Sequence, residues 1–186
     1  MELFSGLLSA LGLSGAAGLN AYIPLLIVGL MNRLGYMDLN GPFDILSHPY
    51  FMVLVGLLAA LDFVGDKIPG VDHALHVAGS VINTGAGAVL AASQMGVADV
   101  PPAVSAVLGL LVAGGVHATR TAVRPVATAT TAGLGNPVVS AAEDAGSLTL
   151  SVLAVFMPVL AVLGLLGLAG VALSLYSKVK GRRQRI

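Results

Sequence analysis

The residues of this chain that could do chemistry fall on four short stripes of polar side chains. Asp62 and Asp66 lie four residues apart, so on one helix they share a face. The other three stripes repeat at intervals of three and four residues, which is the period of a single helical face. They comprise His73, His76, Ser80 and Asn83; His117, Arg120 and Arg124; and Asn136, Ser140, Glu143, Ser147 and Ser151. The sequence therefore predicts four helices that each turn polar groups to one side.

One chemistry open to these residues is metal binding. Asp72 and His76 lie four residues apart and His73 and His76 three apart, so either pair can reach one ion from a single helix. Against this, the basic residues near these stripes would repel a cation. No other cofactor is expected. Side chains that could complete a metal site with Asp72 and His76 are Asp62, Asp66, His117 and Glu143.

Two other chemistries fit the same residues. Arg120 and Arg124, with Lys67 and the start of a helix behind Asn136-Pro137, could hold a phosphate or a carboxylate. Histidines and acids at graded depth could instead relay protons. Catalysis has the least support, because no nucleophile elbow, oxyanion motif or phosphate-cradling glycine loop accompanies the serines. We therefore expect a protein that is not an enzyme.

The composition places the stripes in a membrane protein. Hydrophobic residues make up 56% of the 186 residues and charged residues only 10%, whereas a soluble domain carries about a quarter charged residues. The apolar runs are of membrane-spanning length. Cysteine is absent, which excludes disulfides, thiolate metal ligands and cysteine nucleophiles. We expect the lipid bilayer as a partner and no nucleic acid.

The apolar runs and turn residues predict an all-α membrane bundle of about six transmembrane helices over residues 1–176, with a basic tail at 177–186. The first span, 3–33, is expected to break near Gly15–Pro24, because Asn20 and Pro24 follow a run of small residues. An unbroken, closely packed crossing is the alternative. The other spans are expected at 50–65, 71–95, 103–124, 137–155 and 159–176.

The connection before the fifth span carries further expectations. Pro125 is expected to end or kink the fourth span, and residues 126–137 to form a loop or a re-entrant segment. Asn136 is expected to cap the fifth span, with Pro137 in its first turn.

The adjacent acids Glu143 and Asp144 point about 100° apart on a helix, so only one of them can face a given volume squarely. One of them is expected to pair with Arg120 or Arg124, if only to hold two helices together. His117 by itself is more typical of a packing residue than of a ligand.

Lysine and arginine positions orient the predicted bundle. With the basic tail in the cytoplasm, six spans place both termini there, and Lys67, Arg120 and Arg124 lie on the same side. Every polar stripe then starts at the cytoplasmic end and runs toward the midplane. Because an ionised group at the bilayer centre costs on the order of 3 kcal/mol, these groups should face one another or water. We therefore predict a polar vestibule, open to the cytoplasm, between spans two to five.

Four motifs in this order are distinctive: Ser14-Gly-x-x-Gly-x-Asn20-Ala-Tyr-x-Pro24, Asp62-Phe-Val-x-Asp66-Lys67-Ile-Pro69, His117 followed by Arg120, and Asn136-Pro137-x-x-Ser140-x-x-Glu143-Asp144. Together they resemble domain-of-unknown-function family 4126, over nearly the whole chain. The resemblance implies a small bacterial membrane protein, hence a multi-pass protein of the inner membrane, with relatives in plants. Relatives often carry Glu in place of Asp62, and an Arg-Pro pair near Asn83-Thr84 that this chain lacks. The family name implies no activity.

These observations favour a small transporter or channel-like protein for an ion or a small polar solute. The alternative is a membrane scaffold or a binder of lipid headgroups through the basic face and tail, and a membrane enzyme comes third. Gly164, Gly167 and Gly170 favour self-association into a homo-oligomer. The candidate ligand-binding or proton-relay residues are Asp62, Asp66, Asp72, His73, His76, Asn83, His117, Arg120, Arg124, Asn136, Ser140, Glu143 and Asp144.

Overall fold

The structure is a computed structural model that describes residues 2–39, 41–65, 71–95, 100–131 and 135–183. These residues form seven α-helices and one 3-10 helix and contain no strand, which confirms the predicted all-α fold. In chain order the helices are α1 (Glu2–Leu19), α2 (Tyr22–Arg33), η1 (Gly41–Ser47), α3 (Pro49–Gly65), α4 (Val71–Met95), α5 (Pro102–Thr131), α6 (Asn136–Phe156) and α7 (Pro158–Arg183).

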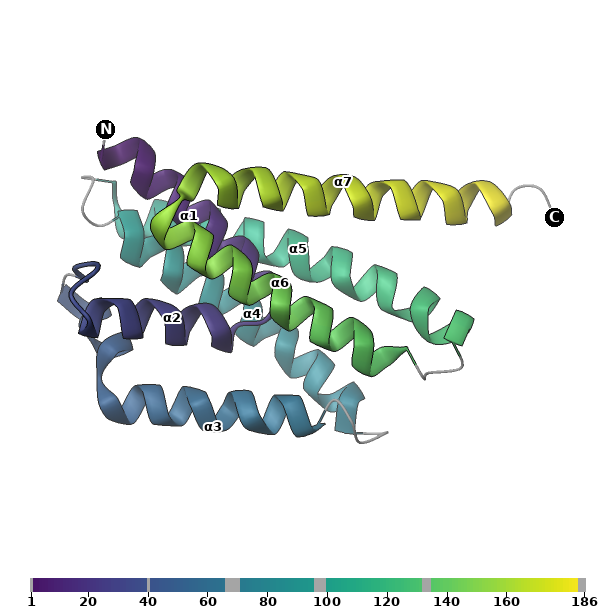
Figure 1. Ribbon diagram of the computed structural model, residues 1–186, viewed down its shortest axis with the longest axis horizontal. Helices are drawn as coiled ribbons and strands as arrows, with labels where there is room; N and C mark the ends of the chain where they lie inside the picture. Colours follow the sequence, from purple (N-terminus) through teal and green to yellow (C-terminus); the bar gives the residue numbers. More distant parts are fainter. Residues whose placement is uncertain (1, 40, 66–70, 96–99, 132–134, 184–186) are drawn as a thin grey trace.

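The first two helices form a hairpin that ends inside the bundle (Figure 1). α1 runs inward from the N-terminal end of the molecule, and α2 returns to that end after a break at residues 20–21. Near the start of α1, the Ser9 hydroxyl donates to Ala154 O at 2.8 Å. Just after α2, the Tyr36 ring packs edge-on against Phe156, with ring centroids 5.9 Å apart. Both open ends of the hairpin therefore lie beside the last turns of α6.

This hairpin differs from the single broken span that was expected over residues 3–33. A single broken span over residues 3–33 would have carried the chain from one end of the bundle to the other. The break falls within the predicted stretch, but the chain reverses there because neighbouring helices supply hydrogen bonds to its exposed backbone. As a result, the start of α1 and the end of α7 lie at opposite ends of the molecule (Figure 1). The membrane topology, with both termini on one side, stays a prediction.

α1 is the central helix of the bundle, in contact with α4, α5, α6 and α7. Residues 9–18 are buried except for the half-buried Leu11, and most of them are Ala, Gly or Ser. Small residues of this kind let helix backbones approach one another. A Cβ atom on Gly12, for example, would lie 2.8 Å from the Cβ atoms of both Ala154 and Ala161. The small side chains of α1 therefore allow neighbouring helices to pack around it on all sides.

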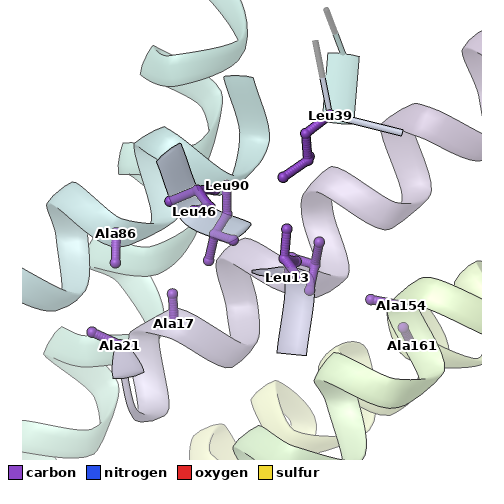
Figure 2. Packing of buried hydrophobic residues seen from close by; sticks show 10 residues of the cluster. Leu13, Ala17, Ala21, Leu39, Leu46, Ala86, Leu90, Ala154 and Ala161 are labelled. Carbon is purple, nitrogen blue, oxygen red and sulfur yellow. The ribbon is translucent and has the colours of Figure 1, made fainter. Parts of the chain in front are cut away.

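The hydrophobic core surrounds this helix (Figure 2). Leu13 of α1 is fully buried, and Figure 2 shows Ala17 and Ala21 farther along the hairpin, toward Ala86 of α4. The core therefore joins the hairpin to the helices on both of its sides. Its members are Leu13, Ala17, Ala21, Val28, Leu39, Leu46, Ala86, Leu90, Ala154 and Ala161.

Two helical segments of the described chain are long and apolar enough to cross a membrane: Pro102–Ala122 of α5 and Asn136–Phe156, which is α6. η1 and α3 qualify together with a bend of 59°, so the number rises to three if that pair is one span. By the same criteria of length and composition, α1, α2 and Pro158–Val171 of α7 are shorter apolar helices. The predicted number of six spans exceeds this count.

The connection between α5 and α6 also differs from the prediction. α5 continues through Pro125 to Thr131, so residues 126–131 are helical and not part of a loop. A proline removes one backbone donor, a loss that long helices in membrane bundles tolerate.

Gly135 precedes α6 without a side-chain cap, so Asn136 is the first helical residue and not the cap that was predicted. Pro137 lies in the first turn, as expected. At the other end of the chain, α7 extends to Arg183 and so includes most of the predicted tail.

The contact between α4 and α5 is close enough to test by substitution. A Cβ atom on Gly109 would meet the carbonyl oxygen of Gly87 and the Cβ atom of Ala91, whereas one on Gly115 would meet nothing within 4 Å. We expect Gly109→Ala to destabilise the protein by about 1–3 kcal/mol through overpacking. Gly115→Ala, on the same helix, should leave stability unchanged or slightly higher. Thermal unfolding in detergent, followed by helical circular dichroism, measures both; identical transitions would contradict the close contact.

Candidate functional site

The tip of the α1–α2 hairpin leaves backbone groups without helical partners, and its own side chain satisfies some of them. The Asn20 Oδ1 atom accepts from Tyr22 N at 2.9 Å and from Ile23 N at 3.4 Å, which caps the start of α2. Pro24, third in α2 and buried, lies in the first turn, where a missing N–H costs nothing. The predicted break residues Asn20 and Pro24 therefore end one helix and begin the next.

Asn83 of α4 supplies the next hydrogen bond to the tip. Its Oδ1 atom accepts from Ala21 N at 3.2 Å, and its Nδ2 atom lies 3.1 Å from His117 Nδ1 on α5. Because the Ala21 N–H needs an acceptor, the Asn83 amide is oriented with Nδ2 toward the histidine, where it can only donate. His117 Nδ1 is then an acceptor, and the proton of the neutral ring is on Nε2. His117 is buried, as a packing residue would be.

An ion-pair cluster closes the other side of the tip. Glu143 Oε2 of α6 lies 2.7 Å from Arg120 Nε and 2.8 Å from Arg124 Nη2. The two arginines are one turn apart on α5. Arg120 Nη1 also donates to Leu19 O at 2.5 Å, at the end of α1, where the helix dipole favours a cation. The three charged side chains are only 12–15% exposed. Removing one partner from such a buried pair costs about 3–5 kcal/mol.

Asp144, the residue after Glu143, points to the hairpin instead. Its Oδ1 atom accepts from Asn20 Nδ2 at 2.8 Å. One turn along α6, the buried Ser147 hydroxyl lies 3.0 Å from Ala16 O and 3.2 Å from Asn20 O. The two adjacent acids thus diverge as predicted: Glu143 pairs with the arginines and Asp144 binds the turn.

These side chains form what we call the tip cluster: Asn20, Asn83, His117, Arg120, Arg124, Glu143, Asp144 and Ser147. Six of them come from the polar stripes of three different helices. Ser147 and the backbone groups of the break were missed as site members. Counting the unpaired N–H and C=O groups that a break at Asn20 must leave would have pointed to both.

Other predicted site residues lie outside this cluster or outside the described residues. Asp62 of α3 is half-buried and lies within electrostatic reach of Tyr22 on α2. Ser140 is buried on α6, and Asn136 is half-buried at the start of that helix. Asp66 and the side chains of Asp72, His73 and His76 lie outside the described residues.

The predicted metal site at Asp72 and His76 is therefore not tested. Among the side chains that the structure describes, no group of three His, Asp or Glu residues is placed to hold a metal ion. Within the tip cluster, Glu143 is held by two arginines and Asp144 by Asn20.

Two cavities lie along the hairpin. The side pocket, of about 450 Å³, lies between α5, α6 and α7 and includes Leu19, Arg120, Arg124 and Glu143 in its walls. The end pocket, of about 360 Å³, lies at the open end of the hairpin. It is lined by Ser5, Gly6, Ser9, Tyr36, Met37, Asp38, Ser93, Gln94 and Val155.

The predicted vestibule between spans two to five is not tested, because several of its polar residues lie outside the described residues, and the side pocket lies elsewhere in the bundle. Of the described residues, none from α3 or α4 lines it, and α7 forms one wall instead. α1 fills the centre of the bundle, and the tip of its hairpin binds Asn83 of α4, Arg120 of α5 and Asp144 of α6.

Asn83 allows a test of the tip cluster. In Asn83→Leu, the buried Ala21 N–H and the Nδ1 atom of His117 both lose the hydrogen bond to the Asn83 side chain, so we expect a loss of about 1–3 kcal/mol in stability. Thr149→Val on α6, which removes an exposed bond to Ala145 O, should change stability by less than about 0.5 kcal/mol. Thermal unfolding in detergent compares the two variants. Equal stability would mean that the tip does not depend on Asn83.

Comparison with known proteins gives one match. Residues 7–178 match the model of a family described as a domain of unknown function, DUF4126. No curated protein and no solved structure matches the chain. The matched range contains the whole hairpin after its first turn and every member of the tip cluster. The family predicted from the sequence motifs is thus confirmed, and the chain belongs to the DUF4126 family.

Proposed function

We propose that this protein is a small membrane transporter or channel-like protein that moves an ion or a small polar solute past the tip cluster. The observation that carries the proposal is the α1–α2 hairpin, whose tip meets charged and amide side chains inside the bundle. Irregular backbone within a membrane is stable only where protein or water satisfies it, and transporters use such broken helices to hold polar substrates.

In this proposal α3 to α7 cross the bilayer, and the hairpin enters from one face without crossing. Support comes from α3 and α7, which expose large apolar side chains along much of their length. Exposed apolar surface on this scale marks contact with lipid or a partner. The exposed leucines are Leu54, Leu57, Leu58 and Leu61 of α3, and Leu160, Leu163, Leu166 and Leu168 of α7.

The orientation follows from the basic residues. The end of α3, the start of α4 and the end of α7 lie at one end of the molecule (Figure 1). In sequence, Lys67 follows α3, and Lys178, Lys180, Arg182 and Arg183 fall in the last turns of α7. That end faces the cytoplasm by the positive-inside rule. The hairpin then opens to the outside of an inner membrane, and the termini lie on opposite sides.

The two cavities suggest how a solute would move. The end pocket opens beside Ser9 on α1, and the side pocket reaches Leu19 at the end of the same helix. Between them, residues 10–18 of α1 are buried apart from Leu11 and close the route. A shift of the hairpin against α4, α5 and α6 would join the pockets. The end of α1 and the start of α2 offer a solute partial charges of opposite sign.

The topology can be tested with single cysteines, because the chain has none of its own. We expect Ser5→Cys, at the start of α1, to react with a membrane-impermeant maleimide from outside intact cells. Asp44→Cys in η1 should react from the same side. A cysteine added after Ile186 should react only in inside-out vesicles. Labelling of Ser5→Cys and the C-terminal cysteine from the same side would contradict this topology and favour a single crossing by residues 3–33.

Transport can be tested with a substitution that preserves shape. Asp144→Asn keeps an oxygen that can accept from Asn20 Nδ2 but removes the charge beside the hairpin tip. We expect solute flux to fall about tenfold or more, because a hydrogen bond to a charged group contributes about 1.5–3 kcal/mol. Asp62→Asn tests the acid on α3 in the same way. The measurement is the current in proteoliposomes under gradients of inorganic cations, chloride, phosphate and small carboxylates.

Asp44→Asn is the matched control, since Asp44 is an exposed acid on η1, away from the tip cluster. It should carry wild-type current, and all three variants should keep wild-type circular dichroism and elution volume. Wild-type currents in both Asp144→Asn and Asp62→Asn would rule out conduction through these acids. A wild-type protein that carries no current for any solute of the panel would rule out the transport proposal for those solutes.

A further inference from the structure

The side pocket has two chemically different parts. Its volume of about 450 Å³ falls in the range of about 300–1,000 Å³ that small-molecule sites occupy. Arg120, Arg124 and Glu143 form a charged part, with Thr119 beside them. The remaining walls are apolar apart from one glycine. They comprise Leu19, Leu111, Val112, Gly115, Val116, Val139, Leu165, Leu166, Leu168 and Ala169.

The charged part of the pocket contains more guanidinium than carboxylate groups among its lining residues. Glu143 is the one carboxylate among the pocket residues, and a single oxygen of it holds both Arg120 and Arg124. Asp144 faces Asn20 and does not line the pocket. Two guanidinium groups and one carboxylate thus line this part in a mostly apolar surrounding, where Coulomb interactions are strong. An anionic group is the complementary ligand for this part.

The apolar part opens toward the outside of the bundle. Leu111 of α5 and Leu166 and Leu168 of α7 line the pocket and are 63%, 62% and 45% exposed. The pocket wall is thus continuous with the exposed leucine surface of these two helices, which contacts acyl chains if the protein spans a bilayer. A soluble anion would make no use of these walls, whereas an acyl chain would cover them.

The surrounding charge favours the same ligand. Figure 1 shows the end of α5, the start of α6 and the end of α7 at one end of the molecule. The chain there continues through Lys178, Lys180, Arg182 and Arg183. Basic residues beside a membrane helix attract anionic lipids.

We propose that the side pocket binds an anionic membrane lipid, with its acidic headgroup at Arg120 and Arg124 and an acyl chain along the leucines of α5 and α7. This site shares the side pocket with the proposed solute route, but lipid binding there does not depend on whether the protein transports anything. A lipid here would contact Leu19 at the end of α1, and so it would also brace the hairpin tip.

The test uses the full chain, purified in detergent and stripped of lipid, with phosphatidylglycerol as the probe. We expect phosphatidylglycerol to bind about tenfold more tightly than phosphatidylcholine with the same acyl chains, because charge-assisted hydrogen bonds to arginine distinguish them. Glycerol phosphate, which has the anionic group without the chains, should not compete at equal concentration. Native mass spectrometry and thermal unfolding with added lipid both measure binding.

Two variants locate the site, each with a control. Arg124→Gln removes one cation and should abolish the preference for phosphatidylglycerol, whereas Arg33→Gln, on exposed α2 surface, should retain it. Ala169→Trp fills the pocket and should weaken phosphatidylglycerol binding about tenfold. Leu163→Trp, exposed on α7 outside the pocket, should bind like wild type. Ala169→Trp keeps both arginines, so it remains informative if Arg124→Gln does not fold.

Three results would overturn the proposal. Equal binding of the two phospholipids would remove the role of the arginines. Wild-type binding by Ala169→Trp would place the lipid elsewhere on the surface. Full competition by glycerol phosphate would show a site for a soluble anion and not for a lipid. None of these results bears on flux, so the lipid site and the transport proposal fail or stand separately.

Discussion

A chain that reverses inside an apolar bundle must find a partner for every backbone N–H and C=O that the reversal exposes. Each unsatisfied group in such surroundings costs several kcal/mol. At the α1–α2 tip, Asn20 binds the first N–H groups of α2, Asn83 binds Ala21 N, and Arg120 binds Leu19 O. The Ser147 hydroxyl lies within hydrogen-bond distance of two further carbonyl oxygens, those of Ala16 and Asn20. The packing of the other helices places these donors and acceptors at the hairpin tip.

The partners come from α4, α5 and α6, so the tip binds three helices that are distant in the chain. Their polar stripes look, in sequence, like the lining of a water-filled space. In the structure, Asn83, Arg120 and Ser147 from these stripes bind the hairpin instead. The small residues of α1 let the three helices pack closely around it. One set of side chains therefore stabilises the hairpin and also concentrates charge beside it. A few charged residues can therefore fill both roles in a protein that is mostly apolar.

Arg120 connects the parts of this arrangement. It binds the last carbonyl of α1, pairs with Glu143 of α6, and lines the side pocket. A ligand at the pocket and a movement of the hairpin would both act on the same guanidinium. Ligand binding in the side pocket can therefore affect the position of the hairpin, and the reverse, through the direct contacts of Arg120.

The sequence by itself determined the helical class, the apolar character and the family, because each follows from residue type and local spacing. It also located the break near Asn20 and the divergence of Glu143 and Asp144, since adjacent residues on a helix cannot share a face. It could not determine that the chain reverses at the break, because a small-residue run with Asn20 fits both a kinked crossing and a hairpin. Only the tertiary structure decided this. Apart from the bonds of Asn20 itself, the hydrogen bonds that satisfy the reversed backbone come from residues 62 to 131 positions away. A local pattern contains no information about which distant side chain will meet a given carbonyl.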